Sequence, residues 1–221
     1  MVDIFDEVEE DLRAERAQRL LRRHAGTLGA AALAVIAVVG GWQAWRWYEA
    51  RQDAAAASAY IAAMNLVEGL PADAEAKGRA PAIEAMQHVA ATAPAGYRSL
   101  ARLWLAAEQA GAGQGDAAAA TWNALADDRA ADPLLRDLAN LLWAQQNLDK
   151  GDPAQVEARL RPLVALGNPW HQIAQEYMAL LFIRTGQKDL ARKTLQVLAA
   201  DATAPVELRN RADGLLNQLG G

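Results

Sequence analysis

Histidine is the residue type in this 221-residue chain best suited to acid–base catalysis or metal binding, and its three copies are widely separated. His24 lies in the amino-terminal segment, His88 falls in a predicted helix, and His171 follows Pro169 closely. The chain contains no cysteine and no HExxH motif, so it lacks the residue patterns typical of zinc sites. We therefore expect no catalytic residues, no metal site and no cofactor, and we interpret the histidines as solvated or helix-capping residues.

Phosphate-containing ligands are not expected either. The segment from Gly111 to Gly115 is rich in glycine, but it has no predicted strand before it and lacks the lysine of a phosphate-binding loop, which favours a turn between helices. The chain carries 22 basic and 27 acidic side chains, and the part after residue 48 shows no block of like charge suited to a polyanion. This balance argues against nucleic-acid binding.

Four tryptophans in the carboxy-terminal part are the remaining candidate functional residues. Tryptophan is enriched both in cores and at the centres of protein interfaces, because its large apolar surface is costly to leave exposed. Three of the four fall on predicted repeat helices. Packing in the core is the favoured interpretation, and lining of a groove that recognises other proteins is the alternative. The candidate protein-binding surface consists of Trp104, Trp122, Trp143 and Trp170.

The elements that hold these residues are predicted to be helices only, which makes the fold class all-α. Alanine and leucine are abundant, β-branched residues are few, and no alternating apolar run reaches strand length. Gly115, Gly151 and Gly186 recur at spacings of 36 and 35 residues, and such fixed periods are typical of solenoids built from helical pairs. Further residues follow the same period: Ala120, Val156 and Ala191; Leu125, Leu160 and Leu195; and Pro133, Pro169 and Pro205.

This period divides the chain into helical pairs. The predicted pairs are Tyr97 to Ala110 with Asp116 to Asp127, Leu134 to Asn147 with Pro153 to Leu166, and Ile173 to Arg184 with Lys188 to Ala199. A helix from Arg46 to about Leu66 is expected to pair with Pro81 to Ala91 across a turn between Gly69 and Gly78. A last helix, Val206 to Leu219, is predicted to cap the solenoid by covering its exposed apolar face.

Local signals at helix ends agree with the division into pairs. Asp116 and Asp152 are predicted to cap the second helices of their pairs, and Pro153 suits the first helical position because its missing N–H costs nothing there. Gly186 suits a left-handed helix end. Pro162 lies inside a predicted helix and is expected to kink it.

The unit from Gln172 to Pro205 is the most regular, and it resembles a tetratricopeptide repeat. The other units are more degenerate, since the first has Glu108 where the repeat requires a small residue. An ordinary helical bundle with accidental spacing is the alternative. The residues that carry the resemblance are Ala179 and Ala191 at the small positions, Phe182 at the aromatic position, Gly186 in the turn, and Leu195 at the large apolar position.

An uncharged segment, residues 25–45, is predicted to be a transmembrane helix. Twenty-one helical residues rise about 32 Å at ~1.5 Å each, which matches a hydrocarbon core of roughly 30 Å. The segment is only modestly hydrophobic because alanine and glycine dilute its leucine, isoleucine and valine residues. Trp42, Trp45, Trp47 and Tyr48 at its end are suited to the membrane–water interface. A signal peptide cleaved near Ala55 to Ala57 is the alternative.

Basic residues determine the predicted orientation. Five arginines precede the segment but only Arg46 and Arg51 closely follow it, which places the amino terminus in the cytoplasm. Residues 1–24 are then a cytoplasmic leader, predicted to be an amphipathic helix with Ile4, Val8 and Leu12 on one face, and serving either as a solvated helix or as a docking helix. Residues 46–221 form the repeat domain on the opposite side of the membrane. The five arginines are Arg13, Arg16, Arg19, Arg22 and Arg23.

One face of the predicted membrane helix carries small residues. Ala30, Ala34, Ala37 and Gly41 follow at spacings of 4, 3 and 4, so they share a face on which a second membrane helix could approach closely. The alternative is that this face reflects the alanine-rich composition of the whole chain. These four residues are the candidate interface between membrane helices.

The leader, the single anchor and the tetratricopeptide-like domain together resemble the YfgM-type family of ancillary Sec translocon subunits, in its alphaproteobacterial form. Two stretches carry the resemblance, Ile4 to Arg13 and Gly96 to Ala107. The resemblance implies a single-pass protein of the bacterial inner membrane, whose periplasmic domain is a scaffold that contacts the translocon channel and periplasmic chaperones or folding factors. It implies no catalytic residues. An adaptor for cell-envelope assembly or division, or a non-catalytic accessory subunit of a membrane enzyme, is the alternative.

Overall fold

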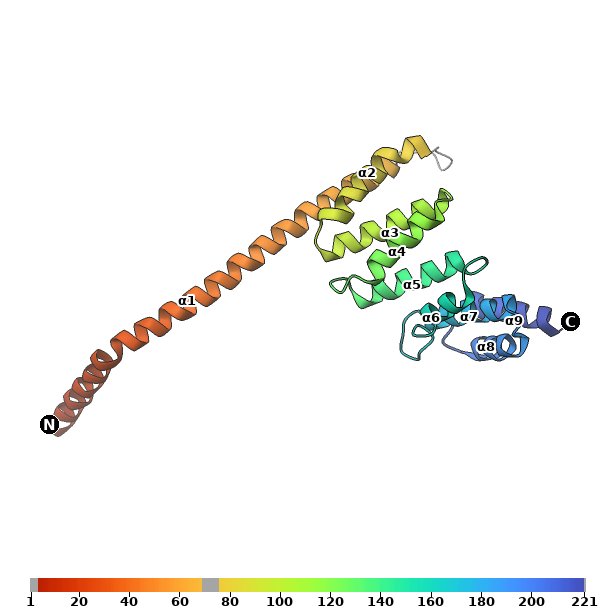
Figure 1. Ribbon diagram of the computed structural model, residues 1–221. Helices are drawn as coiled ribbons and strands as arrows, with labels where there is room; N and C mark the ends of the chain where they lie inside the picture. Colours follow the sequence, from red (N-terminus) through yellow and green to blue (C-terminus); the bar gives the residue numbers. More distant parts are fainter. Residues whose placement is uncertain (1–3, 69–75, 221) are drawn as a thin grey trace. The chain divides into compact units, whose positions relative to one another are not determined.

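The computed structural model describes the backbone of residues 4–68 and 76–220, and these residues fold into nine helices and no strand (Figure 1). Side chains are described for residues 26, 27, 29–68 and 78–220. The all-α prediction is confirmed. The helices are α1 (Ile4–Glu68), α2 (Ala76–Thr92), α3 (Ala95–Gly111), α4 (Gly115–Ala126), α5 (Pro133–Asn147), α6 (Pro153–Leu160), α7 (His171–Arg184), α8 (Lys188–Ala200) and α9 (Val206–Gly220).

The chain divides into two compact units, Met1–Gln52 and Asp53–Gly221. The first unit consists of the amino-terminal part of α1. The side chains of the predicted leader, residues 1–24, lie outside the described residues, as does the side chain of His24. The amphipathic role of the leader therefore stays a prediction.

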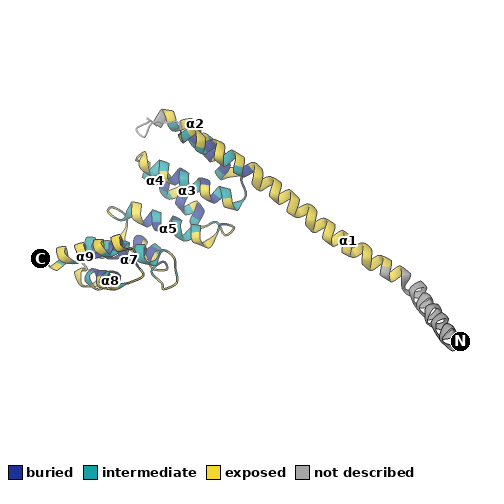
Figure 2. Cartoon of the chain, turned by 180° about the vertical axis from the view of Figure 1, so that it is seen from behind, coloured by how far each residue is buried: buried dark blue, intermediate teal, exposed yellow. Residues whose placement is uncertain are grey.

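The predicted membrane helix, residues 25–45, lies within α1 in the first unit. No helix within the described residues is both long enough and apolar enough to cross a membrane. The predicted segment includes Ala25 and Leu28, whose side chains lie outside the described residues. Membrane insertion stays a prediction. Large apolar side chains of this part of α1 are exposed, with exposed fractions between 56% and 72% for Leu33, Val35, Ile36, Val38 and Val39 (Figure 2).

In the second unit, α2 to α9 pack in chain order, each helix against the next, as expected for a tetratricopeptide-like solenoid (Figure 1). The end of α1 contributes Ala56 and Ala63 to a core shared with Met86 and Val89 of α2, which confirms the predicted first pair. Several alanine residues of α3, α4, α5, α7 and α8 are fully buried, and their small side chains let neighbouring helices approach closely. They include Ala106, Ala118, Ala139, Ala144, Ala174, Ala179 and Ala191.

The carboxy-terminal helix α9 packs on the last pair, as predicted for a cap. Leu208 is 3% exposed and Ala212 is fully buried, and both belong to a core cluster with Leu195 and Leu198 of α8. Arg211 of α9 donates two hydrogen bonds to the buried carboxylate of Glu176 on α7, at 2.6 and 2.9 Å. Because charge-assisted pairs of this kind are directional, they fix the orientation of α9 as well as its position.

The first repeat has a different register from the one that the glycine spacing predicts. Gly113, with a φ of 74°, and Gly186, with a φ of 76°, occupy the same place after their helices, whereas Gly115 is the first residue of α4. The sequence period thus aligned the wrong glycine of the Gly111 to Gly115 segment. With the shift of two residues, the small position falls on the buried Ala106 rather than on Glu108, and the next one falls on the buried Ala118 rather than on Ala120.

Three other local predictions are resolved by the helix ends. Asp152 caps α6 by accepting a hydrogen bond from the Ala154 N–H, and Pro153 takes the first helical position, as predicted. Asp116 lies in the first turn of α4 and is not its cap. The predicted kink at Pro162 is wrong, because α6 ends at Leu160, before this proline, which lacks the N–H that would continue the helix.

Candidate functional site

The described residues contain no group of three His, Cys, Asp or Glu side chains that could hold a metal ion. His88 is exposed on α2. His171 opens α7, where its Nδ1 lies 2.8 Å from the Asn168 carbonyl oxygen and its Nε2 lies 3.9 Å from a carboxylate oxygen of Asp201. The structure therefore places these two histidines in separate parts of the repeat domain, and His171 is part of the local structure at a loop.

The four candidate tryptophans do not form one surface. Trp122 is 4% exposed and Trp143 is 7% exposed, so both are core residues and little of either is accessible to a partner. The indole N–H groups of these two residues are buried and have no hydrogen-bond partner. Trp104 and Trp170 are partly buried at the edges of two different cores, and the indole N–H of Trp170 donates to the Leu134 carbonyl oxygen at 3.1 Å. A binding role for the tryptophans stays a prediction.

A polar cluster around Arg159 joins three helices at the centre of the domain. The guanidinium of Arg159 on α6 donates to Asn123 on α4 at 2.6 Å and to Asn140 on α5 at 3.0 Å. Its centre also lies 4.0 Å from the ring centroid of Trp143, within the range of a cation–π interaction. Burial lowers the pKa of Arg159. The cluster links α4 of one helical pair to α5 and α6 of the next, and no local sequence pattern predicts it.

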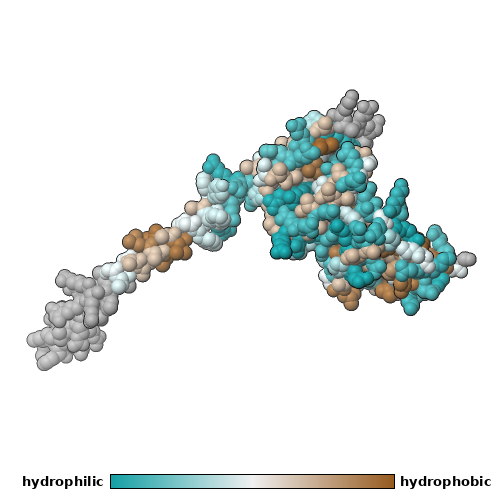
Figure 3. Space-filling view, viewed as in Figure 1, coloured by the Kyte–Doolittle hydropathy of each residue, from teal (hydrophilic) through white to brown (hydrophobic). Residues whose placement is uncertain are grey.

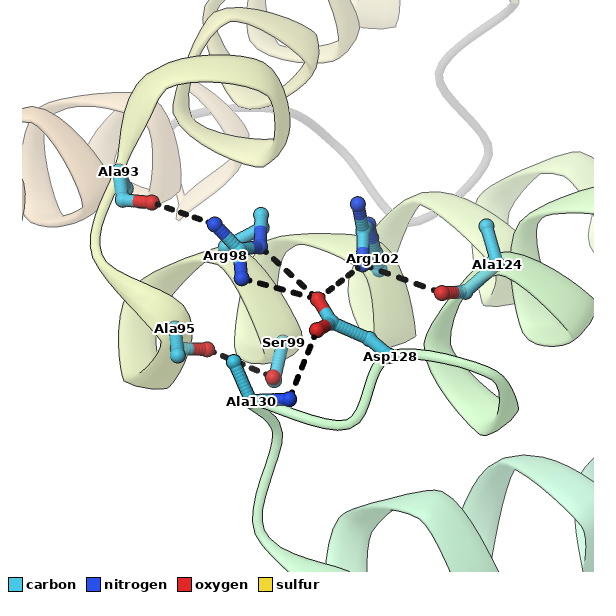
Figure 4. Close-up of polar contacts among 8 residues, drawn as sticks. All are labelled: Ala93, Ala95, Arg98, Ser99, Arg102, Ala124, Asp128 and Ala130. Atoms are coloured by element: carbon cyan, nitrogen blue, oxygen red, sulfur yellow. Dashed lines mark hydrogen bonds and ion pairs between the residues drawn. The ribbon is translucent and has the colours of Figure 1, made fainter.

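The loop between α4 and α5 is held by Asp128 (Figure 4). Its Oδ1 accepts the Ala130 N–H at 3.0 Å, while its Oδ2 accepts hydrogen bonds from Arg98 at 3.0 Å and Arg102 at 2.8 Å, both on α3. Burial raises the pKa of Asp128, but the Ala130 N–H and the two guanidinium groups outweigh it, so the pKa is lowered. The carboxylate thus closes its own loop and braces it against the preceding pair.

A similar arrangement occurs at the next two loops between helical pairs, which are the α6–α7 loop and the α8–α9 loop. Asn168 accepts the Trp170 N–H at 2.9 Å and donates to Asp137 on α5 at 2.8 Å. Asp201 accepts the Thr203 N–H at 2.8 Å and a hydrogen bond from Gln172 on α7 at 2.8 Å. Sequence reasoning missed these residues, although a signal exists: each is an Asp or Asn shortly before a proline, namely before Pro133, Pro169 and Pro205.

The surface of the repeat domain is hollowed in several places. One hollow lies between α4 and α5, with Trp122, Gln145 and Asp149 in its lining. A second lies over α2, α3 and α4, and its lining includes Gln87, Arg102 and Thr121. A third lies between the α6–α7 loop and the end of α8, and its lining combines apolar and charged side chains. The third hollow is the one whose rim is formed by exposed apolar residues.

The small-residue face of the predicted membrane helix is exposed along α1. Ala30, Ala34, Ala37 and Gly41 are all exposed, and nothing lies within 4 Å of a Cβ built on Gly41. Among the described side chains of the first unit, nothing covers this face, and the interface that we predict for it stays a prediction.

Comparison with known proteins gives a family for this architecture. A family model described as a tetratricopeptide repeat-like domain matches residues 19–141, more than half of the chain. The chain belongs to the tetratricopeptide repeat-like family. No curated protein and no solved structure matches it significantly.

Membership of the tetratricopeptide repeat-like family indicates a function in protein–protein interaction. Stacked helical repeats create extended surfaces that bind other proteins, and scaffolds of this kind are typically non-catalytic. The matched residues run from α1 into α5, so the regular unit from Gln172 to Pro205 lies beyond them. The helical pairs beyond residue 141 nevertheless repeat the same packing of buried alanines.

Proposed function

We propose that this protein is a membrane-tethered scaffold that binds partner proteins through its tetratricopeptide repeat-like domain. The observation that carries the proposal is the combination of this domain with an uncharged segment, residues 25–45, whose described large apolar side chains are exposed. Exposed apolar surface of this extent is favourable only where lipid or a partner covers it. Trp42 and Trp47 support the proposal, since each lies about 5 Å from an arginine one helical turn later, an arrangement suited to the membrane–water interface.

The partners that we propose are the Sec translocon channel and periplasmic chaperones or folding factors. The support is the resemblance of the leader Ile4 to Arg13 and of the segment Gly96 to Ala107 to the YfgM-type family. The five arginines before residue 25 support an amino terminus in the cytoplasm, and hence a repeat domain in the periplasm of the bacterial inner membrane. Tethering beside the channel raises the local concentration of the scaffold, so weak contacts with emerging chains become effective.

Charges in the apolar segment test the tether. The full chain with Val35→Arg and Val38→Arg carries two side chains that each cost about 2.5–3.5 kcal/mol at the centre of a membrane helix. We expect the variant to leave the membrane fraction, whereas the matched control with Val35→Leu and Val38→Leu stays there after carbonate extraction. An arginine variant that remains membrane-bound contradicts the tether.

Crosslinking tests the partners. The full chain and the arginine variant are crosslinked in native membranes, and channel subunits and chaperones are quantified by mass spectrometry. Enrichment of both with the full chain, and loss of the channel with the variant, are expected. Alkaline phosphatase fused after Gly221 is expected to be active, since this enzyme folds only outside the cytoplasm. An inactive fusion, or enrichment of envelope synthases in place of the channel, overturns this part of the proposal.

A further inference from the structure

The hollow between the α6–α7 loop and the end of α8 has a composition unlike its surroundings. Leu166 in the loop and Val197 on α8 are the exposed large apolar residues of its lining, which we call its rim, and His171, Gln175, Asp201 and Thr203 give the lining its polar groups. Its volume is about 560 Å³, enough for large side chains of another protein. All of these lining residues belong to the second unit of the chain.

The rim is apolar and uncovered. Leu166 is 91% exposed and Val197 is 61% exposed. Figure 3 shows apolar surface over α8 and over the loop that leads from α6 to α7. Isolated exposed apolar residues are normal on a protein surface, but two that frame one hollow form a concentrated apolar site.

Hydrogen bonds hold the backbone of the loop that carries Leu166. Asn168, two residues later, donates its N–H to the Ala165 carbonyl oxygen at 3.1 Å, accepts the Trp170 N–H and donates to Asp137. Gly167 supplies the left-handed backbone conformation, with a φ of 95°, that this path requires. A backbone held in place before binding loses less conformational entropy when a partner binds, so Leu166 is suited to be an anchor.

The polar part of the lining carries a negative charge at Asp201. The Thr203 hydroxyl, Gln172 and the Thr203 N–H lower the pKa of Asp201 to about 2, so its carboxylate is ionised at neutral pH. Among the described residues that line the hollow, Asp201 is the one with a fixed charge. Lys193 lies four residues before Val197 on α8, and Asp201 lies four residues after it, so opposite charges flank Val197 along the chain. This order of charges selects the direction in which a charged partner segment lies.

We propose that this hollow is a docking site for a segment of a partner protein in which a large aliphatic side chain is followed by lysine or arginine. The aliphatic side chain fills the space between Leu166 and Val197, and the cationic side chain lies over Asp201. The site rests on the proposed scaffold function and specifies one surface and one partner chemistry for it.

The test uses the full chain in detergent and two fluorescent 12-residue probe peptides that differ only at the residue after a central leucine, which is lysine in one and glutamate in the other. Fluorescence anisotropy measures binding. We expect the lysine peptide to bind at least tenfold more tightly than the glutamate peptide. The variant Leu166→Ser with Val197→Ser is expected to weaken binding of the lysine peptide at least tenfold.

The matched control replaces two other exposed apolar residues of the same domain, Leu190 and Val206, by serine; they are 44% and 54% exposed. Unchanged binding in this control is expected. Equal binding of the two peptides, or equal weakening by the control, overturns the docking site. A rim variant that instead converts a dimer to a monomer in light scattering also overturns it, because the occupant is then a second copy. If the rim variant still copurifies with the full set of membrane partners, the docking site fails while the scaffold function stands.

Discussion

The turn in the middle pair, between α5 and α6, differs from the turns in the pairs on either side. Between α3 and α4, and between α7 and α8, a glycine with positive φ ends the first helix, and two backbone N–H groups bond back to its last carbonyl oxygens. For Gly186 these bonds run from its own N–H to Ile183 at 3.1 Å and from Gln187 to Phe182 at 2.8 Å. The middle turn lacks the first feature, since Gly151 has no positive φ, and its own backbone bonds run from the Leu148 N–H to Gln145 at 3.2 Å and from the Gly151 N–H to Asn147 at 2.8 Å.

The middle turn receives hydrogen bonds from a side chain of the next repeat. Arg184, at the end of α7, donates to the Leu148 carbonyl oxygen at 2.6 Å and to the Gly151 carbonyl oxygen at 2.8 Å. A side chain of the next repeat thus adds two hydrogen bonds to the middle turn, beyond those that its own backbone makes. The comparison teaches that the outer turns are local structures, whereas the middle turn depends on the neighbouring repeat.

The largest expected effect comes from removing that support. Arg184→Ala leaves two carbonyl groups without their charged donor, and we expect a loss of about 3 kcal/mol in the free energy of unfolding. Arg161→Ala is the control, because this exposed arginine makes only an ion pair with Glu157 one turn earlier and is expected to cost less than about 0.5 kcal/mol. Urea unfolding of the full chain in detergent measures both. Equal losses would show that the middle turn is as local as the outer ones.

Alanine at Gly151 is expected to have the next largest effect. A Cβ there lies 2.7 Å from both the Cβ and the carbonyl oxygen of Asn147, so the backbone has to move. We expect Gly151→Ala to lower the free energy of unfolding by about 2 kcal/mol through overpacking. Thermal unfolding followed by circular dichroism checks this, and an unchanged midpoint would mean that the close approach is not constraining.

The outer turns are expected to respond through backbone conformation. Gly113→Ala and Gly186→Ala each force a side chain into the left-handed region and are expected to cost about 1 kcal/mol. Gly115→Ala is the control, with an expected effect of opposite sign. Gly115 is helical, and the nearest neighbouring atom lies 3.9 Å from a Cβ built on it. Alanine there is expected to raise the free energy of unfolding by about 0.5–1 kcal/mol. Destabilisation by Gly115→Ala would restore the register that the sequence period predicts.

The smallest effect concerns the loops between repeats, where the middle repeat uses Asn168 and the last uses Asp201. The pKa of Asp201 is lowered from 3.8 to about 2, so its carboxylate adds stability that is complete above about pH 4 and is lost as pH falls toward 2. Asp201→Asn keeps the acceptor for the Thr203 N–H but removes this titration. The stability difference between wild type and variant is expected to vanish in that window, and a difference independent of pH in acid unfolding would exclude the carboxylate as its source.

The sequence predicted the helices well because the 3.6-residue period, proline and capping residues act locally. It located α7, α8 and α9 to within two residues at each end. It misplaced the first repeat, since Gly113 and Gly115 are equally good turn residues by type and only the backbone bonds distinguish them. It also missed Arg184, Arg159 and the rim residue Leu166, because their roles depend on contacts between repeats or on the absence of a cover, and neither leaves a local pattern.

The distribution of tryptophan has a spectroscopic consequence. Trp42, Trp45 and Trp47 are exposed on α1, whereas the other four are buried or partly buried in the repeat domain. Intrinsic fluorescence therefore contains two populations that respond to different events. Lipid vesicles are expected to shift the emission of the first population to shorter wavelength, and denaturant to shift the second to longer wavelength. The unmodified chain thus carries separate optical reporters for membrane contact and for unfolding of the repeats.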